Sequence, residues 1–478
     1  MARIDLVVVG GGTAGLVAAI GAVGQGAHVV LIERDRTGGD CLWTGCVPSK
    51  ALIAAADAAH TARTSAHLGV HAGDVTVDFA GVMAHVKTAI TTIEPHDSPE
   101  RLRRLGIEVI HGDARFVAPD EVEVGGRRLR FRRALVATGA SAALPPIPGL
   151  AAVAPLTSES LWDLIERPER LAVLGAGPVG CELGQAFGRL GSRVSLVESA
   201  DRVLPREEPE ASERIAGHLR QEGIDVRVGA RALRVESDGD GHGLVVRDTA
   251  GEHRIGFDRI LVAVGRVPRT DGLGLDVAQV ARTDQGAVEV DDRLQTSNRR
   301  IYAAGDVTMK LPFTHVAAAH GAIVVQNALF GLRARVDHER IPWVTFTAPE
   351  VARVGLGVAE ARTRFGAGVS VRIADHDGLD RAVTAAATDG FAQLVSDDKG
   401  RLIGATVVGP RAGETMGELV AWMAAGAKVS AISRSSTHAY PTWSDDVAAA
   451  SLQELQTSLA RLKPVTRVLL WVRRFLDR

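Results

Sequence analysis

The feature that most constrains this chain is a glycine pattern at the end of its first apolar run. Gly10, Gly12 and Gly15 form G-x-G-x-x-G directly after "LVVV", and Glu33 ends the next β-branched run. Such glycines permit a tight turn, close approach of the backbone to a pyrophosphate and close helix packing, while the helix N-terminus faces the phosphates and the acid accepts ribose hydroxyls. A lone pattern of this kind can be only a glycine-rich turn. With strand, helix and acid in register, it predicts a dinucleotide site.

The same device returns in the middle of the chain. Gly175, Gly177 and Gly180 follow "LAVL", and Glu198 ends the next run. Because two dinucleotides rarely both act as hydride carriers, we expect one to be a flavin that accepts hydride from the other and passes electrons on. Glu198 favours NAD, since a carboxylate would repel the 2′-phosphate of NADP. Arg202 lies close enough in sequence to leave NADPH open as the less favoured donor.

Composition excludes other classes of partner. A chain of 478 residues predicts about three domains, and its net charge of -2 and 4% aromatic residues argue against nucleic acid as a ligand. Residues 6–32 contain no Asp, Glu, Lys or Arg and are long enough to cross a bilayer. Their glycines and short β-branched runs instead predict strand, turn, helix and strand. The N-terminus shows no cleavage site, so we expect a cytoplasmic location.

Two of the three cysteines lie five positions apart in "GGDCLWTGCVPSK". On an ideal helix Cys41 and Cys46 would be about 8 to 9 Å apart at Cα, whereas a disulfide tolerates at most about 7 Å. The backbone between them must therefore be distorted, which Gly45 permits, and Pro48 suits the first turn of the following helix. A helix N-terminus favours a thiolate and so redox chemistry. A structural disulfide and a metal site that lacks two ligands remain as alternatives.

Further motifs occur in order along the chain. They are "LVATGA" (135–140), "LVAVGRVPRT" (261–270), "IYAAGDV" (301–307), "FTHVAAAHG" (313–321) and "FTAPEVARVGL" (346–356). With the cysteine motif and the two glycine patterns, they make the chain resemble, over nearly its whole length, the class I pyridine nucleotide disulfide oxidoreductases. Dihydrolipoamide dehydrogenase, glutathione reductase and mercuric reductase are members of that family.

The resemblance implies a fold and a domain order. The fold is α/β, with two Rossmann-like dinucleotide-binding domains, for FAD and NAD, and an α+β C-terminal dimerisation domain. The expected FAD-binding domain has two halves, and a homodimer is expected. The implied boundaries are 1–150 and 270–339 for FAD, 151–269 for NAD(P), 340–460 for dimerisation and 461–478 for a basic amphipathic tail.

The resemblance also implies residue roles. Cys46 would be the thiolate that exchanges electrons with the flavin, and Cys41 the thiol that faces the substrate. Lys50 and Glu182 would form an ion pair near the flavin ring; without the resemblance they read as ordinary surface charges. Asp306 would hold the ribityl chain, and the helix N-terminus at Thr314 and His315 would stabilise negative charge on reduced flavin. Other implied cofactor contacts are Asp40, Ala114, Thr138, Gly139 and Gly265.

One motif departs from the family pattern. Members that reduce disulfides carry a His and a Glu contributed across the dimer, and here "STHAYPTWSDD" places Tyr440 and Asp445 at those positions. His438, two residues earlier, would point elsewhere on an extended chain. A tyrosine, with a pKa near 10, is a poor base at neutral pH. Mercuric reductase also lacks the histidine, but its C-terminal cysteine pair is missing here. The acceptor is thus open among a disulfide, a metal ion and a quinone-like molecule.

The C-terminal tail alternates basic and apolar residues at helical spacing. Val465, Val468, Leu469, Val472 and Phe475 would share one side. Such a helix docks more often on its own protein than on a membrane surface, so docking is favoured and weak membrane contact is the alternative. The whole chain predicts an NAD(P)H-dependent flavoprotein oxidoreductase with a small-molecule acceptor. The alternatives are an NADPH-dependent metal-ion reductase and a non-catalytic redox sensor that uses the cysteines as a switch.

Overall fold

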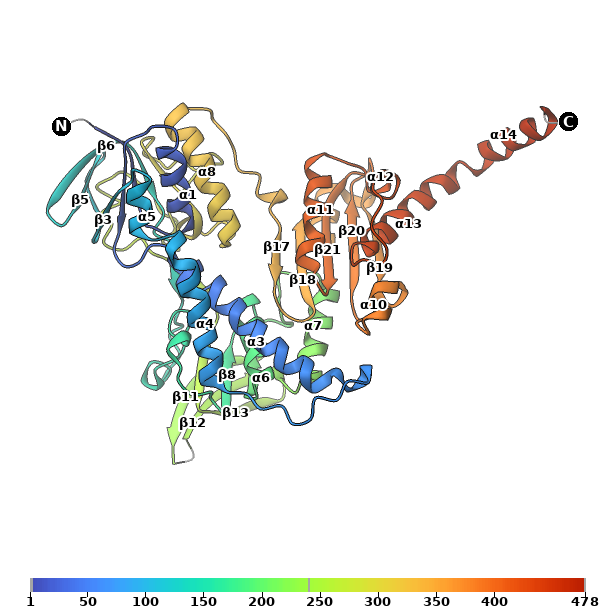
Figure 1. The fold of residues 1–478 in the computed structure, drawn as a ribbon, viewed down its shortest axis with the longest axis horizontal. Coiled ribbons are helices and arrows are strands. Elements are labelled where there is room, and N and C mark those ends of the chain that lie inside the picture. The colour runs from blue at the N-terminus through green and yellow to red at the C-terminus, as the bar shows by residue number, and fades with distance from the viewer. Residues whose placement is uncertain (1–2, 240, 477–478) are drawn as a thin grey trace. The chain divides into compact units, whose positions relative to one another are not determined.

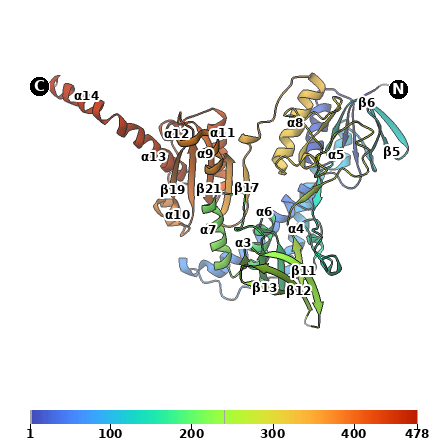
Figure 2. The ribbon, with the colours of Figure 1, turned by 180° about the vertical axis from the view of Figure 1, so that it is seen from behind.

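A computed structural model describes residues 3–239 and 241–476. The chain divides into two compact units, each built from two segments of sequence (Figure 1; Figure 2). The first unit holds both glycine patterns and the cysteine pair, and the second holds the "STHAYPTWSDD" segment. The first unit comprises Met1–Asp201 and Glu222–His338, and the second comprises Arg202–Gln221 and Glu339–Arg478.

The largest sheet of the first unit is assembled from distant parts of the chain. Its parallel strands run in the order β3-β2-β1-β6, and β16 pairs with the C-terminal end of β6. The apolar runs of β1 and β2 are buried almost throughout, as expected for parallel strands covered on both faces. The strands are β1 (Ile4–Val9), β2 (Val29–Glu33), β3 (Glu108–His111), β6 (Arg127–Val136) and β16 (Ile301–Ala303).

Two helices pack together against this sheet. They are α1 (Thr13–Val23) and α8 (Thr314–Phe330), whose buried side chains share one core cluster with β1 and β2. The uncharged segment 6–32 thus folds as β1, α1 and β2, as predicted. Within 3–239 and 241–476, no helix is long and apolar enough to cross a membrane. Other elements here are β4 (Arg115–Ala118), β5 (Glu121–Val124), α3 (Cys46–Thr64), α4 (Phe79–Ile93) and α5 (Pro99–Arg104).

The second glycine pattern lies in a smaller parallel sheet of the same unit. Its order is β10-β9-β8-β14, and α6 follows β8 directly, repeating the strand, turn and helix of the N-terminus. An antiparallel meander, β11-β12-β13, shares a core with this sheet. The bounds are β8 (Arg170–Leu174), α6 (Pro178–Arg189), β9 (Arg193–Val197), β10 (Asp225–Arg227), β11 (Arg231–Asp238), β12 (Gly241–Asp248), β13 (Gly251–Phe257) and β14 (Arg259–Val262).

The second unit is built on an antiparallel sheet of five strands in the order β17-β18-β21-β20-β19. Helices α11, α12 and α13 share its core, in which Val354, Leu394 and Leu419 are buried. The bounds are β17 (Trp343–Thr345), β18 (Glu350–Gly355), α9 (Val358–Phe365), β19 (Ser370–Asp375), α10 (Asp380–Thr384), β20 (Phe391–Ser396), β21 (Leu402–Gly409), α11 (Ala412–Ala424), α12 (Val429–Ser435) and α13 (Asp445–Arg461).

Helix α7 (Pro209–Gln221) groups with the second unit, although its sequence lies between β9 and β10. Just before it, Glu207 accepts a hydrogen bond from the Trp343 indole at 2.6 Å. Arg214, on the helix, pairs with Asp389 at 2.8 Å. Contacts between residues far apart in sequence therefore decide where α7 belongs.

The C-terminal tail forms a separate helix, α14 (Lys463–Leu476), which follows α13 (Figure 1). None of its described residues, 463–476, is buried. The structure therefore does not show the docking on its own protein that the sequence favoured. Asp477 and Arg478, the last residues of the expected tail, lie outside the described residues.

Candidate active site

The first glycine turn joins the end of β1 to α1. Gly10 has a φ of 108°, and a Cβ there would lie 2.3 Å from the Ala137 carbonyl oxygen. A Cβ on Gly15 would lie 1.9 Å from the Gly10 carbonyl oxygen, so the helix packs on the turn only as glycine. Glu33, at the end of β2, accepts a hydrogen bond from the Gly11 N–H at 2.6 Å. Turn, helix start and acid thus meet at one place.

The second turn reproduces this geometry in the other parallel sheet. A Cβ on Gly180 would lie 1.9 Å from the Gly175 carbonyl oxygen, and Glu198 accepts from the Ala176 N–H at 2.8 Å. At Gly177, which precedes α6, no atom of the described chain lies within 4 Å of a Cβ position. The space beside this helix start is therefore open. The first unit contains two cradles of the kind that hold a dinucleotide.

The backbone breaks between the two cysteines. Helix α2 (Gly39–Trp43) ends before α3 begins at Cys46, and Gly45 lies in the break. A Cβ on Gly45 would come 2.9 Å from the Asp40 carbonyl oxygen. Cys41 and Cys46 are free thiols in this structure. The distortion predicted from their spacing is thus present.

Negative charge is favoured on Cys46 rather than on Cys41. The hydrogen bond from Cys41 lowers the pKa of Cys46 to about 6, with help from Thr314 and the charge of Lys50. The Cys46 sulfur lies 3.1 Å from the Thr314 hydroxyl, in the first turn of α8. The same hydrogen bond, together with burial, raises the pKa of Cys41. At neutral pH the pair is therefore a Cys46 thiolate hydrogen-bonded by a Cys41 thiol.

An ion pair stands one helical turn from Cys46. Lys50 Nζ and Glu182 Oε2 are 2.7 Å apart, which joins α3 to α6. The Glu182 side chain is only 8% exposed, so it is a largely desolvated carboxylate held by a cation. Both charges act on the pKa of the Cys46 thiol: Lys50 lowers it and Glu182 raises it.

The alkylation rate of Cys46 in the reduced protein should rise with pH around a midpoint near pH 6, because only the thiolate attacks iodoacetamide. Lys50→Met should move this midpoint up by about one pH unit, since a cation is lost and Glu182 is left unopposed. The double variant with Glu182→Gln should return it close to the wild-type value. Mass spectrometry of the labelled peptide measures the rate. An unchanged midpoint in Lys50→Met would show that the ion pair does not act on the thiol.

Two arginines that were not predicted as site residues form ion pairs with the predicted cofactor residues. Arg266 pairs with Asp40, and its Nε lies 3.4 Å from Asp306. Arg269 pairs with Asp40 at 3.2 Å and with Glu159 at 3.0 Å. Burial raises the pKa of Asp306, and Arg266 opposes this rise. Both arginines belong to "LVAVGRVPRT", so the motif was the available signal.

Three other predicted cofactor residues lie in loops beside these arginines. The Thr138 hydroxyl donates to the Arg269 carbonyl at 2.7 Å, and the Arg269 N–H donates to the Gly139 carbonyl at 3.0 Å. The Gly265 carbonyl accepts from the Ala143 N–H at 2.9 Å. These bonds tie the loops after β6 and β14 together.

The last two predicted cofactor residues are Ala114 and His315. Ala114 precedes β4 and packs against the core of the largest sheet. His315, in the first turn of α8, stacks on Phe313 with ring centroids 5.6 Å apart. Thr314 is the member of this turn that reaches the cysteine pair.

The atoms around the first cradle leave room for FAD. Around a Cβ built on Gly12, the nearest atom of the described residues is Gly39 Cα at 3.8 Å, so the helix start is open to a phosphate. Arg266 Nε is buried; it makes no well-formed hydrogen bond within 3–239 and 241–476 and has only the 3.4 Å ion pair with Asp306. Glu33 sits where a ribose hydroxyl would be accepted.

The C-terminal motif lies in the second unit. The Tyr440 hydroxyl donates to Asp380, and this hydrogen bond raises the pKa of Tyr440. Tyr440 is 75% exposed. His438 is engaged elsewhere, 2.9 Å from Glu418, and Asp445 begins α13. The motif therefore presents a phenol and holds its nearest imidazole against a carboxylate.

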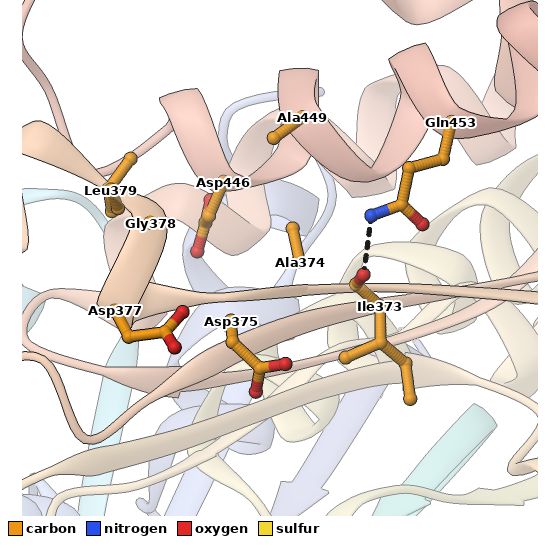
Figure 3. Close-up of a pocket in the computed structure, with 9 residues that line it drawn as sticks. All are labelled: Ile373, Ala374, Asp375, Asp377, Gly378, Leu379, Asp446, Ala449 and Gln453. Carbon is orange, nitrogen blue, oxygen red and sulfur yellow. Dashed lines mark hydrogen bonds between the residues drawn. The ribbon is translucent and has the colours of Figure 1, made fainter.

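A pocket lies in the second unit between α13 and β19 (Figure 3). Asp446 lines it and is buried, with Oδ2 3.0 Å from His376 Nε2; burial raises its pKa. No sequence motif joins His376 to Asp446, which lie 70 positions apart, so only the neighbouring Asp445 was predicted. No group of three or more His, Cys, Asp or Glu within the described ranges is placed to hold a metal ion. The lining residues are Ile373, Ala374, Asp375, Asp377, Gly378, Leu379, Asp446, Ala449 and Gln453.

Two dinucleotide cradles and a reactive dithiol in one unit define an oxidoreductase. A family model described as pyridine nucleotide-disulphide oxidoreductase matches residues 4–321, and that family's dimerisation domain matches 341–451. The chain belongs to the pyridine nucleotide-disulphide oxidoreductase family. This confirms the expected fold class, the class of flavoprotein oxidoreductase and the cofactors FAD and NAD(P)H that the family uses.

The chain is similar to several known enzymes. It is 39% identical over 413 residues to a mercuric reductase of Bacillus cereus, a match that covers 86% of this chain and 65% of that one. It is 36% identical to a mercuric reductase of Streptomyces lividans, covering 96% of this chain and 97% of the other. A solved Cu(II) complex of the HOCl-induced flavoprotein disulfide reductase RclA from Escherichia coli has a TM-score of 0.83 and 27% identity, covering 95% of this chain and 100% of that one.

Proposed function

We propose that this protein is a homodimeric, cytoplasmic NADH-dependent reductase that delivers electrons through FAD and the Cys41–Cys46 pair to a thiophilic metal ion. The observation that carries the proposal is the Cys46 thiolate, which contacts Thr314 and lies one turn from Lys50, in the unit that holds both cradles. When bound, FAD supplies the two-electron link between nicotinamide and thiols. A reducing cytoplasm would keep the pair ready to react.

The chain's own residues would hold the two dinucleotides and set the protonation of the two cysteines. The first cradle and Asp306 would hold FAD, and the second cradle would hold NADH. Cys41 keeps its proton while hydrogen-bonded to Cys46. When the two sulfurs join as a disulfide, the Cys46 thiolate and the Cys41 thiol together lose two electrons and one proton, and two Cu(II) ions or one Hg(II) ion can accept the electrons. NADH would supply the two electrons and the one proton that restore the thiolate and the thiol, and would become NAD⁺.

The choice of a metal ion rests on the C-terminal motif. Reduction of a small disulfide releases a thiolate that must be protonated, and a group that titrates near neutrality speeds this step. Tyr440 does not titrate there, because its hydrogen bond to Asp380 raises its pKa further. A metal ion needs no such proton. The mercuric reductase relatives and the Cu(II) complex of RclA support the same acceptor class.

The test is NADH oxidation by the purified dimer with a panel of acceptors. We expect the largest kcat/KM with Hg(II) or Cu(II), and lower values with lipoamide, glutathione disulfide and quinones. Turnover that is highest with a disulfide would favour the second candidate, a disulfide reductase. Negligible turnover with every acceptor would favour a redox sensor with a Cys41–Cys46 switch.

We also propose the domain boundaries that the sequence predicts, on three observations. The pairing of β16 with β6 supports an FAD domain made of 1–150 and 270–339. The small parallel sheet supports an NAD domain at 151–269, although α7 groups with the second unit. The dimerisation-domain match supports 340–460 as the dimer interface.

Wild-type enzyme should prefer NADH, and Glu198→Arg should shift the preference toward NADPH. Glu198 accepts from Ala176 and Ala200 N–H groups, which fixes a carboxylate where a 2′-phosphate would lie. An arginine there can pair with that phosphate. The ratio of kcat/KM for the two donors should move by at least about tenfold. A wild-type preference for NADPH would contradict this and point to Arg202.

A further inference from the structure

Helix α14 has an apolar face that the described protein does not cover. The eight large apolar side chains of the helix are between 40% and 75% exposed, whereas α11 and α13 each bury one face. The sequence 463–476 spans about 21 Å as a helix, too short to cross a bilayer. Something other than the resolved fold must cover this face when it is not in water. The eight side chains are Val465, Val468, Leu469, Leu470, Trp471, Val472, Phe475 and Leu476.

These side chains divide sharply around the helix axis. At about 100° per residue, seven of them fall in one arc of about 160°, with Trp471 at its edge. Leu470 alone falls on the opposite side, among the cations. An arc of this width exceeds the narrow seam of a coiled coil, and 14 residues make only two heptads.

All the charged residues of α14 are basic and lie on its polar side. Lys463, Arg467, Arg473 and Arg474 are four of the chain's 55 Lys and Arg residues, whereas none of its 57 Asp and Glu residues falls in 463–476. The chain as a whole carries a net charge of -2, so α14 is a cationic segment on a slightly acidic protein. A helix that only docks on its own protein has no need of an unmixed cationic face.

We propose that α14 lies flat on an anionic lipid surface and makes this protein a peripheral membrane protein. The apolar arc would enter the boundary between headgroups and acyl chains, and the cations would meet anionic headgroups. Trp471, at the edge of the arc, is placed at the polar boundary where tryptophan is favoured. The inference is independent of the electron acceptor, since it rests on α14 alone.

The test is cosedimentation of the full-length dimer with vesicles of phosphatidylcholine, with and without a minority of phosphatidylglycerol. We expect binding only to the anionic vesicles, and weaker binding as salt is raised. Arg467→Gln with Arg474→Gln should weaken it about 25-fold, taking fivefold for each basic residue. Val468→Asn should weaken it by about tenfold or more.

Leu470→Asn is the matched control, because it removes a similar apolar side chain from the cationic side of the same helix. It should bind the anionic vesicles almost as well as wild type. Absence of binding by wild type at low salt, or equal losses in Val468→Asn and Leu470→Asn, would overturn the proposal. A change in the mass or melting temperature of the lipid-free dimer in Val468→Asn alone would also overturn it, because protein would then cover the face.

Discussion

Replacing Cys41 with serine should lower kcat/KM for the acceptor by at least about a thousandfold, the scale on which loss of an essential nucleophile acts. Serine can still donate a hydrogen bond to Cys46, so the pKa of that thiol should stay low. It cannot form the second half of a disulfide. Stopped-flow absorbance should show that NADH still reduces the bound flavin at nearly the wild-type rate, which separates the two halves of the reaction.

Cys181→Ser is the matched control for this variant. Cys181 is fully buried, and its thiol donates to the Ala176 carbonyl at 3.3 Å, a bond that serine can keep. It should retain acceptor turnover within about a factor of three, since a satisfied buried hydrogen bond is exchanged for a similar one. Full acceptor turnover in Cys41→Ser would mean that electrons reach the acceptor directly from flavin. The cysteine pair would then not carry the reaction.

The parts of the site that the sequence predicted are those fixed by local geometry. The two glycine turns and their acids lie within single strand-turn-helix-strand segments, so spacing alone locates Glu33 and Glu198. The helix break near Gly45 followed from the reach of a disulfide. Lys50 and Glu182, 132 positions apart, were paired only through the family resemblance, because no local pattern joins α3 to α6.

The parts that the sequence missed depend on contacts over long sequence separations. Arg266 meets Asp40 across 226 positions, and His376 meets Asp446 across 70, so neither pair leaves a periodic pattern. Helix α7 lies between β9 and β10 in the sequence, and only its contacts group it with the second unit. For α14 the sequence predicted the amphipathic helix that the structure has, whereas the expected docking stays a prediction, because a pattern shows a face without showing what covers it.

Giving the motif a neutral-pH acid and base should raise turnover with lipoamide or glutathione disulfide by about 10²- to 10⁴-fold. The variant is Tyr440→His with Asp445→Glu. Asp380→Asn should be added, because Asp380 now holds the Tyr440 hydroxyl and would stabilise a protonated imidazole in its place. Steady-state NADH oxidation with each acceptor measures the gain. Reduction of the metal ion should change little, since no leaving thiolate needs a proton there.

Tyr440→Phe keeps the aromatic ring and removes only the hydroxyl group. If Tyr440 has no acid or base role, this variant should keep metal-ion turnover close to wild type and leave disulfide turnover low. High disulfide turnover in the wild type would contradict the argument and direct attention to His438, which Glu418 holds at 2.9 Å. His438→Asn would then have to abolish that turnover, because His438 is the only histidine in the "STHAYPTWSDD" segment. Low disulfide turnover that rises in the engineered variant would show that Tyr440 and Asp445, with Asp380 beside them, select the acceptor.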